Sequence, residues 1–427
     1  MKKVSIFITF IVISIAALGQ TDSQTFNTFI SDINKVESKY KEYYNKKEYK
    51  QTEIFLKEVL RLVENLKLTP DQTAKFQLPL QRIKAETYYN LACTYSLSNQ
   101  KKQATAAFEK AIELGYSEYR HATTDSDLDN IRKEKKFIAL LDRIKQFDKL
   151  VQLQSAQGYQ KENTDSLPQF SYQSPEDYNL KEVRSFFKLD SVAGNGDELS
   201  KIINILNFIH NVIKHNGSNY ALCEFDAIDI YNYNKSTSKG VNCRHLAIAL
   251  NEMYLSMGIP SRYVTCLPKD ENDQDCHVIN SVYSTQLQKW LWIDPTFNAY
   301  VKDENGNLLS IAEVRERLIS GKPLVLNDDA NWNNQTKQTK EHYLETYMAK
   351  NLYWFECVAY SRFNPESRYR KVNNQYIALK PIGFGDNVTE KTQSSTITTH
   401  DPEYFWQVPP GLSGLRLSTL KEEMNKN

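Results

Sequence analysis

The sequence has few cysteines, almost no net charge and no long apolar run beyond its N-terminus, and each of these features argues against a class of protein. Its six cysteines, among 427 residues, are too few and too scattered for a disulfide scaffold. The 53 basic and 52 acidic side chains nearly cancel, so no excess charge favours nucleic acid or an anionic membrane as a partner. Beyond the N-terminus no run of about 18 apolar residues could span a bilayer. Neither a Gly-rich phosphate loop nor a paired-carboxylate signature stands out. What remains is a globular chain, 41% hydrophobic and long enough for two or three domains.

The first nineteen residues predict a signal peptide. "MKKVSIFITFIVISIAALG" has a basic start and an apolar run, and it ends in small residues at Ala17 and Gly19. An anchor that is never cleaved is the alternative. Gln20 stands where a bacterial lipoprotein would have cysteine. We therefore expect a periplasmic or secreted protein without a membrane anchor after cleavage.

Residues 25–150 show a helical pattern throughout. Small and aromatic residues recur within it at offsets that resemble a tetratricopeptide repeat: Tyr88, Leu91, Ala92, Tyr95, Ala104, Phe108 and Ala111. One clear repeat predicts a short helical domain and not a long solenoid. Such a domain either recruits a protein partner or packs as an appendage, and the sequence leaves both open.

The rest of the chain divides by composition and periodicity. Polar residues 151–180 predict a linker, residues 197–217 a helix, and the Asn- and Tyr-rich residues 218–239 a loop. Runs rich in β-formers, "SRYVTCLP", "CHVINSVY" and "KWLWIDPT", predict strands. Residues 326–427 predict a C-terminal extension that packs on or follows the preceding domain.

Cys243 lies where a buried helix should begin. Asn242 is a favoured N-cap residue, and Gly258 supplies a stop. The apolar residues of the helix repeat on one face, which Cys243 shares: Leu246, Leu250, Met253 and Met257. Unpaired N–H groups and the positive end of the helix dipole lower the pKa of a thiol there. The position suits a nucleophile, although buried free cysteines are common in protein cores.

A thiol nucleophile needs a base, and the base needs an orienting acceptor. His277 and Asp294 lie on two successive predicted strands. Pairing them directly across an antiparallel hairpin puts the turn in the polar stretch "STQLQK". We therefore predict that both side chains emerge on one face as neighbours and complete a Cys-His-Asp site. The alternative is three unrelated core residues.

Three blocks of sequence carry a family resemblance: "GVNCRHLAIALNEMYLSMGIPSRYV", "DCHVINSVY" and "WLWIDPT". In this order they resemble a transglutaminase-like domain, which we place at residues 181–325. The resemblance implies an α+β, papain-like fold, in which a helix bearing the cysteine packs on an antiparallel sheet. It also implies that Cys243 is the nucleophile, His277 the base and Asp294 the residue that orients the histidine. One departure is Val241-Asn242, where the family often has glycine or another short lead-in.

Other residues near these blocks have simpler explanations. His245 lies about 200° round the helix from Cys243, which predicts a surface or packing role. A zinc site could draw on Cys243, His245, Cys266, Cys276 and His277. No Cys-x-x-Cys pair is present, however, and Cys276 and His277 should point to opposite faces of a strand. Trp292 shares the face of Asp294 and is either core or a cleft wall. We expect neither a metal nor another cofactor.

The family resemblance implies acyl transfer on an amide, by hydrolysis or by transamidation. The expected partner is a protein or peptide substrate, and a secreted chain without an amine-acceptor feature favours hydrolysis. The rival hypothesis is a catalytically silent scaffold that uses the helical repeat to recruit a partner. A structural cell-envelope role has no sequence feature behind it beyond export.

Overall fold

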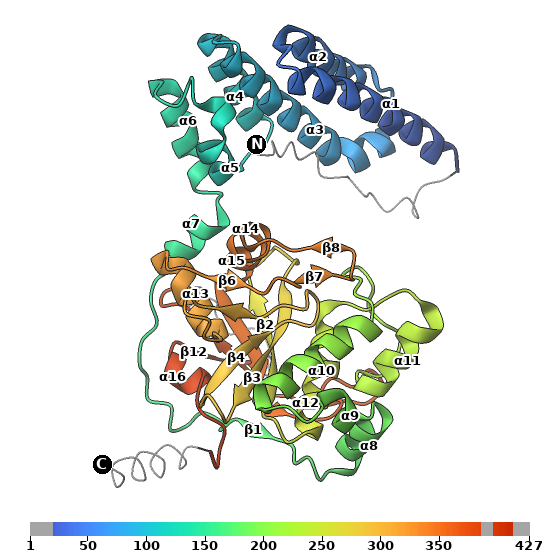
Figure 1. The fold of residues 1–427 in the computed structure, drawn as a ribbon, viewed down its shortest axis with the longest axis vertical. Helices are drawn as coiled ribbons and strands as arrows, with labels where there is room; N and C mark the ends of the chain where they lie inside the picture. Colours follow the sequence, from blue (N-terminus) through green and yellow to red (C-terminus); the bar gives the residue numbers. More distant parts are fainter. Residues whose placement is uncertain (1–19, 386–395, 413–427) are drawn as a thin grey trace. The chain divides into compact units, whose positions relative to one another are not determined.

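The computed structural model describes residues 20–385 and 396–412 (Figure 1). The predicted signal peptide, residues 1–19, lies outside them. The chain forms two compact units, Met1–Val151 and Gln152–Asn427, and each is considered by itself. No helix in the described part of the chain combines the length and the apolar character needed to cross a membrane.

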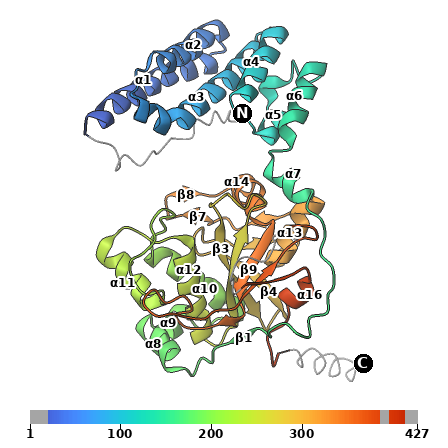
Figure 2. The same ribbon diagram turned by 180° about the vertical axis from the view of Figure 1, so that it is seen from behind.

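Unit 1 is helical, as predicted. Thr69 starts helix α3 with a capping box, in which its hydroxyl accepts from the Gln72 N–H and the Gln72 side chain accepts from the Thr69 N–H. Helices α3 and α4 pack closely because Ala92 and Ala104 are fully buried between them. The identity of this pair as a tetratricopeptide repeat stays a prediction. The helices are α1 (Gln20–Asn45), α2 (Tyr49–Asn65), α3 (Pro70–Leu97), α4 (Lys101–Glu113), α5 (Tyr119–Thr124), η2 (Ser126–Leu128) and α6 (Lys135–Lys145), followed by α7 (Lys149–Gln154) at the boundary (Figures 1 and 2).

Unit 2 is built on a six-stranded sheet of order β12-β11-β9-β2-β3-β4. All neighbouring pairs are antiparallel except β11 and β12. The C-terminal region supplies three of these strands. The strands are β2 (Ser261–Leu267), β3 (His277–Ser284), β4 (Lys289–Ile293), β9 (Trp354–Val358), β11 (Tyr376–Leu379) and β12 (Thr396–Thr399).

Helix α12 (Cys243–Ser256) lies at the centre of unit 2. It packs against β2 and β3 on one side and against α8, α10 and α11 on the other, so every residue from His245 to Ser256 is buried. Burying one Leu or Met side chain in this way stabilises the fold by about 1.5–3 kcal/mol. The covering helices are α8 (Tyr178–Phe186), α9 (Leu189–Ala193), α10 (Glu198–Val212) and α11 (Ala227–Thr237); α13 (Ile311–Ser320) and α16 (Pro402–Phe405) lie on the other side of the sheet (Figures 1 and 2). The predicted fold class, an α+β domain with the Cys-bearing helix on the sheet and a helical region before it, is confirmed.

The prediction of a loop over residues 218–239 was wrong in part, because it missed helix α11. Asp226 starts this helix by accepting hydrogen bonds from the N–H groups of Ile228 and Asp229, at 3.1 and 3.0 Å. Only Ala227, Ile230 and Asn234 of the helix are buried. So few inward positions leave little apolar periodicity for the sequence to reveal.

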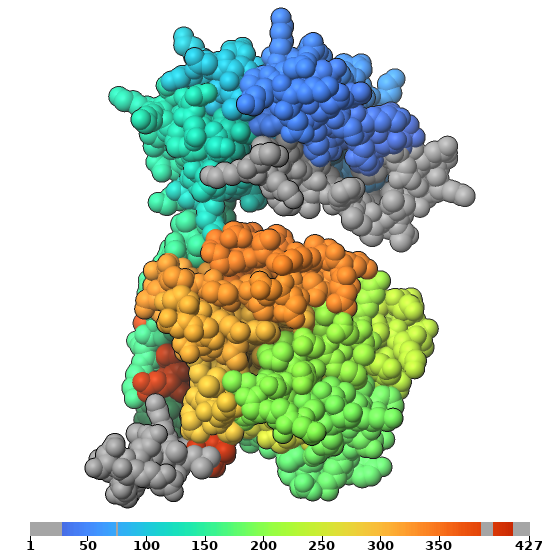
Figure 3. Space-filling view, viewed as in Figure 1, coloured from blue at the N-terminus to red at the C-terminus, as the bar shows by residue number. Residues whose placement is uncertain are grey.

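Between β4 and β9, unit 2 contains a segment of short strands and helices. It contains two small antiparallel strand pairs: β5 (Val301–Lys302) with β6 (Val325–Leu326), which helix α13 separates in sequence, and the hairpin β7 (Asn331–Trp332) with β8 (Thr336–Lys337). Helix α14 (Lys340–His342), a π-helical turn η3 (Tyr343–Met348) and α15 (Ala349–Asn351) follow, while β1 (Ser171–Tyr172) pairs with β10 (Tyr360–Ser361). The orange segments of this region form a continuous surface in the space-filling view (Figure 3).

Candidate active site

Cys243 is the first residue of helix α12, as predicted. The Asn242 side chain caps the helix by accepting a hydrogen bond from the His245 N–H at 3.1 Å. Gly258, with φ +74°, follows the end of the helix in the left-handed conformation that glycine favours. Cys243 packs against the buried core and keeps partial exposure. Cys243 thus lies in the first turn of helix α12, where the N–H groups have no acceptor within the helix itself.

His277 and Asp294 are brought together at the end of the β3–β4 hairpin. His277 opens strand β3 and Asp294 directly follows strand β4; both are essentially inaccessible to solvent. The Nε2 atom of His277 donates to Oδ2 of Asp294 at 2.8 Å. The two side chains are thus neighbours, and a catalytic role for them stays a prediction.

The predicted register was wrong by two residues. Ser284 pairs with Lys289 and Asn280 with Ile293, so the continued register puts Ile279 opposite Asp294 and His277 diagonal to it. The turn still falls in the predicted stretch, and Glu198 of helix α10 sets its position. The carboxylate of Glu198 accepts hydrogen bonds from the backbone N–H groups of residues 285 and 286, at 3.0 and 2.9 Å. A two-residue shift keeps both side chains on one face, because side chains alternate along a strand.

The thiol and the imidazole shift each other's pKa strongly. Burial raises the pKa of the Cys243 thiol, but hydrogen bonds from His215 and His277, the charge of His277 and the Val278 N–H outweigh it and lower the pKa to about 6. Burial lowers the pKa of His277, but the charge and hydrogen bond of Asp294, together with Cys243, outweigh it and raise the pKa to about 10. Between these values the stable form is a thiolate–imidazolium pair.

Asp294 is held by four donors. Its Oδ1 accepts from the N–H groups of Thr296 (2.8 Å) and Phe297 (3.4 Å). Its Oδ2 accepts from His277 and from the hydroxyl of Tyr343 (2.6 Å). Donors on both oxygens hold the carboxylate in one orientation relative to the imidazole.

The π-helical turn η3 contributes two tyrosines to the site, and the sequence reasoning missed both. Tyr343 donates to Asp294 and itself accepts from the Trp292 indole N–H at 3.1 Å. The Tyr347 hydroxyl lies 3.3 Å from Nδ1 of His277, the nitrogen that Asp294 leaves free. Trp292 is thus a core residue, which was one of its two interpretations. Its indole N–H donates to Tyr343, which in turn donates to Asp294, the acceptor of the His277 hydrogen bond. The only signal of η3 was a pair of tyrosines four residues apart, which carries little weight in a chain with 26 of them.

A second histidine, His215, also reaches Cys243, and the sequence reasoning missed it. Its side chain hydrogen-bonds the thiol, and its Nδ1 accepts from the Trp332 indole N–H at 2.9 Å. In sequence His215 sits at the end of a predicted helix, just before an Asn-Gly pair, where nothing indicates chemistry.

Comparison with known proteins bears on this arrangement. Residues 187–295 match the model of the transglutaminase-like superfamily. The chain therefore carries a transglutaminase-like domain after a helical N-terminal region. This matched range holds His215, Cys243, His277 and Asp294 and ends before Trp332.

One curated relative is a chloroplastic protein from Arabidopsis thaliana. It is 36% identical over 111 residues, which are 25% of this chain and 32% of that protein. The alignment thus spans about a third of the length of the relative. No solved structure matches the chain.

His245 has a packing role in the transglutaminase-like domain. It is buried, and its ring meets those of Tyr220 and Phe225 edge-on, at 5.1 and 4.5 Å. Burial lowers the pKa of His245 to about 4, so it is neutral near pH 7. All six cysteines of the chain lie within the described residues, and all are free.

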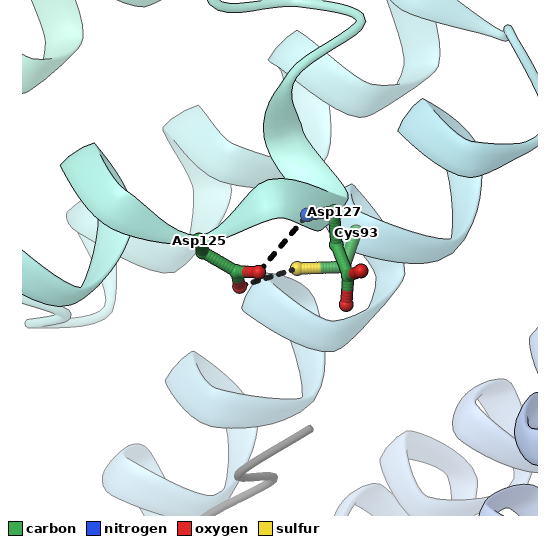
Figure 4. Close-up of side chains that lie close together, drawn as sticks. All are labelled: Cys93, Asp125 and Asp127. Atoms are coloured by element: carbon green, nitrogen blue, oxygen red, sulfur yellow. Dashed lines mark hydrogen bonds between the residues drawn. The ribbon is translucent and has the colours of Figure 1, made fainter. Parts of the chain in front are cut away.

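The described residues contain one group with the composition of a metal site, and it lies in unit 1. Cys93, Asp125 and Asp127 have ligand atoms within 4.8 Å of one another (Figure 4). Asp125 already accepts from the Tyr89 hydroxyl at 2.7 Å and Asp127 from the Tyr44 hydroxyl. Phenol donors on both carboxylates make this group a partly buried hydrogen-bond network, and we assign it no metal.

Proposed function

We propose that the protein is a thiol-dependent acyl-transfer enzyme acting on amide bonds, with Cys243, His277 and Asp294 as its catalytic residues. The observation that carries the proposal is the chain of contacts from a thiol of lowered pKa, through a buried imidazole, to a carboxylate 2.8 Å from that imidazole. Structural cysteines in protein cores have raised pKa values, as Cys266 does in the same sheet.

The proposed reaction begins from the thiolate–imidazolium pair. The Cys243 sulfur attacks the amide carbonyl carbon, and the electron pair of the C=O bond moves onto oxygen. His277 donates its proton to the leaving amine as the C–N bond breaks, which leaves a thioester. Asp294 holds the ring so that its other nitrogen faces the reacting atoms, and its charge stabilises the imidazolium. The N–H groups in the first turn of helix α12 that the Asn242 cap does not use favour the transient oxyanion.

The thioester then passes to a second acceptor. For hydrolysis, His277 takes a proton from water, the hydroxide attacks the thioester, and the thiolate is regenerated with a carboxylic acid. A protein or peptide exported from the cytoplasm is the substrate we expect, and water is the acceptor available in excess there. Transfer to an amine follows the same steps with the amine in place of water.

Thiol reactivity tests the proposal without a known substrate. Cys243 labelling by iodoacetamide, followed by mass spectrometry from pH 5 to 9, should reach half its maximum rate near pH 6. Cys223 and Cys276 are matched controls in the same protein, because both are partly exposed and burial raises the pKa of each. The substitution His277→Ala should remove the early labelling. An ordinary labelling profile for Cys243 in folded protein would contradict the enzyme and favour the silent scaffold.

The fate of the acyl group separates the two outcomes of the reaction. Peptide mixtures incubated in ¹⁸O-labelled water with a fluorescent primary amine should yield ¹⁸O-labelled carboxyl groups if water is the acceptor. Fluorescent peptides would instead indicate transamidation. The Cys243→Ala protein should yield neither product, which excludes a contaminating enzyme.

A further inference from the structure

The backbone around His215 is bound to the segment that leads into Cys243. His215 and Val241 form a parallel β-bridge, in which the Asn216 N–H donates to the Val241 carbonyl at 2.7 Å and the Val241 N–H to the Lys214 carbonyl at 2.9 Å. Gly240, at φ +76°, permits this approach, because a Cβ there would lie 2.9 Å from the Lys214 carbonyl oxygen. His215 is thus fixed beside the start of helix α12.

The ring of His215 has one accepting nitrogen and one donating nitrogen. An indole N–H is a donor only, so the 2.9 Å bond from Trp332 makes Nδ1 the acceptor. In the neutral ring the proton must then lie on Nε2. A second proton on Nδ1 would point at the Trp332 N–H and break that bond. His215 is therefore built to donate and not to act as a base.

The hairpin that carries Trp332 is held to the same segment. Asn333 accepts from the His215 N–H at 2.8 Å and donates to the His215 carbonyl at 2.9 Å. The side-chain oxygen of Asn331 lies 2.9 Å from Nε2 of His210. The backbone and the ring of His215 are thus oriented by one short hairpin, β7–β8.

Because the Trp332 N–H occupies Nδ1 of His215, the hydrogen bond from His215 that lowers the pKa of the Cys243 thiol is assigned to Nε2. The His215 side chain makes one of the two imidazole hydrogen bonds to Cys243, and His277 makes the other. The two rings differ in function, since His277 shares a charge with Asp294 and moves a proton, whereas the tautomer of His215 is locked.

We propose that His215 is a second catalytic histidine, a neutral donor to the Cys243 sulfur and then to the carbonyl oxygen of the attacked amide, and that Trp332 positions it. This inference rests on the proposed acyl transfer and adds a residue to it. In the attack, the sulfur gives up its negative charge as the S–C bond forms, and the charge appears on the adjacent oxygen. The hydrogen bond donated by the Nε2–H group of His215 shifts from the sulfur to that oxygen, and no proton leaves His215 at any step.

Two reactions of the same thiolate test the two halves of the proposal. Alkylation by iodoacetamide develops no oxyanion, whereas acylation by p-nitrophenyl acetate does. The substitution His215→Leu should raise the pH midpoint of Cys243 alkylation by about one unit, because one donor to the ionised sulfur is lost. At pH 9, where most of the thiol is ionised in both proteins, acylation should be about 10²-fold slower while alkylation stays within a few fold.

Three further variants define the role of the ring. His215→Gln keeps an N–H donor of similar reach and should recover most of the acylation rate. Trp332→Phe keeps the aromatic volume but frees the tautomer, and it should fall between His215→Leu and the unaltered protein. His342→Leu removes an exposed histidine of helix α14 and should change neither reaction. Near-ultraviolet circular dichroism checks that each variant is folded.

The outcomes separate this inference from the proposed function. If the unaltered protein labels as an ordinary thiol, both fail. If it labels early and His215→Leu labels identically, His215 is not a donor to the sulfur and only the inference fails. Equal loss of alkylation and acylation at pH 9 would overturn the oxyanion role. A shifted midpoint with selective loss of acylation supports both halves, even if no amide substrate is turned over.

Discussion

The substitution Asp294→Asn should abolish the ionisation of Cys243 at neutral pH. The amide keeps an oxygen for the Thr296 N–H but presents an NH₂ group to His277 and Tyr343, which are both donors. The imidazolium then has no buried counter-charge. Since burial by itself lowers the pKa of His277, the ring becomes neutral and the thiolate loses its charged partner.

The size of the effect follows from the pKa values. The pKa of His277 lies at about 10 against an ordinary 6.5, a difference of about 3.5 units or about 5 kcal/mol. With a pKa of about 6, Cys243 is about 90% thiolate at pH 7. If its pKa returns to the ordinary 9.0 or above, about 1% or less is thiolate. Labelling at pH 7 should therefore slow by about 10²-fold.

The assay is iodoacetamide labelling of Cys243 at fixed pH, read by mass spectrometry. Asp401→Asn is a matched control, because Asp401 is also a buried carboxylate: its Oδ1 caps helix α16, which Asn can also do, and its Oδ2 accepts from the Glu162 N–H. Thermal unfolding establishes that Asp294→Asn is folded. Labelling at pH 7 within a few fold of the unaltered protein would refute the view that Asp294 sustains the ion pair.

Three further predictions concern the same site and the residues that hold it in place. Amide turnover should show a bell-shaped pH profile with limbs near pH 6 and pH 10. The stabilisation that the His277 imidazolium gives the fold is full below pH 6.5 and is lost as the pH rises through about 10. The stabilisation from the Cys243 thiolate is full above pH 9.0 and is lost as the pH falls through about 6. Tyr343→Phe should lower the free energy of unfolding in urea by about 1–3 kcal/mol, since it leaves the Trp292 N–H without its acceptor. It should not lower the pKa of His277, because the Asp294 carboxylate loses a donor that competes with the imidazole. Asn242→Ala should cost about 1 kcal/mol in the same measurement through loss of the helix cap, and an unchanged unfolding midpoint would count against that cap.

The sequence predicts those parts of the site whose cause is local. Asn242 followed by an apolar stripe specifies where helix α12 begins, because capping and periodicity act within a few residues. The shared face of His277 and Asp294 follows from the two-residue period of a strand. Their register was two residues off because Glu198, far upstream, fixes the turn.

The missed residues depend on contacts between distant segments. Trp332 and His215 meet only because the β7–β8 hairpin, between strands β4 and β9, returns to the segment that follows helix α10. Tyr343 lies in a π-helical turn, and such turns have no strong sequence pattern. Tertiary packing decides both, and a single sequence carries little trace of it.

Strand β9 has a consequence for the order in which the surroundings of Cys243 are completed. β9 pairs with Val264–Leu267 of β2, and the segment before it supplies Trp332 and Tyr343. A growing chain that has reached only residue 300 holds Cys243, His277 and Asp294 but has an open edge at β2 and lacks both aromatic partners. At that stage the hydrogen bonds from Trp332 to His215 and from Tyr343 to Asp294 cannot form. The surroundings of Cys243, His277 and Asp294 are thus complete only after residues 301–358 have been added and have folded.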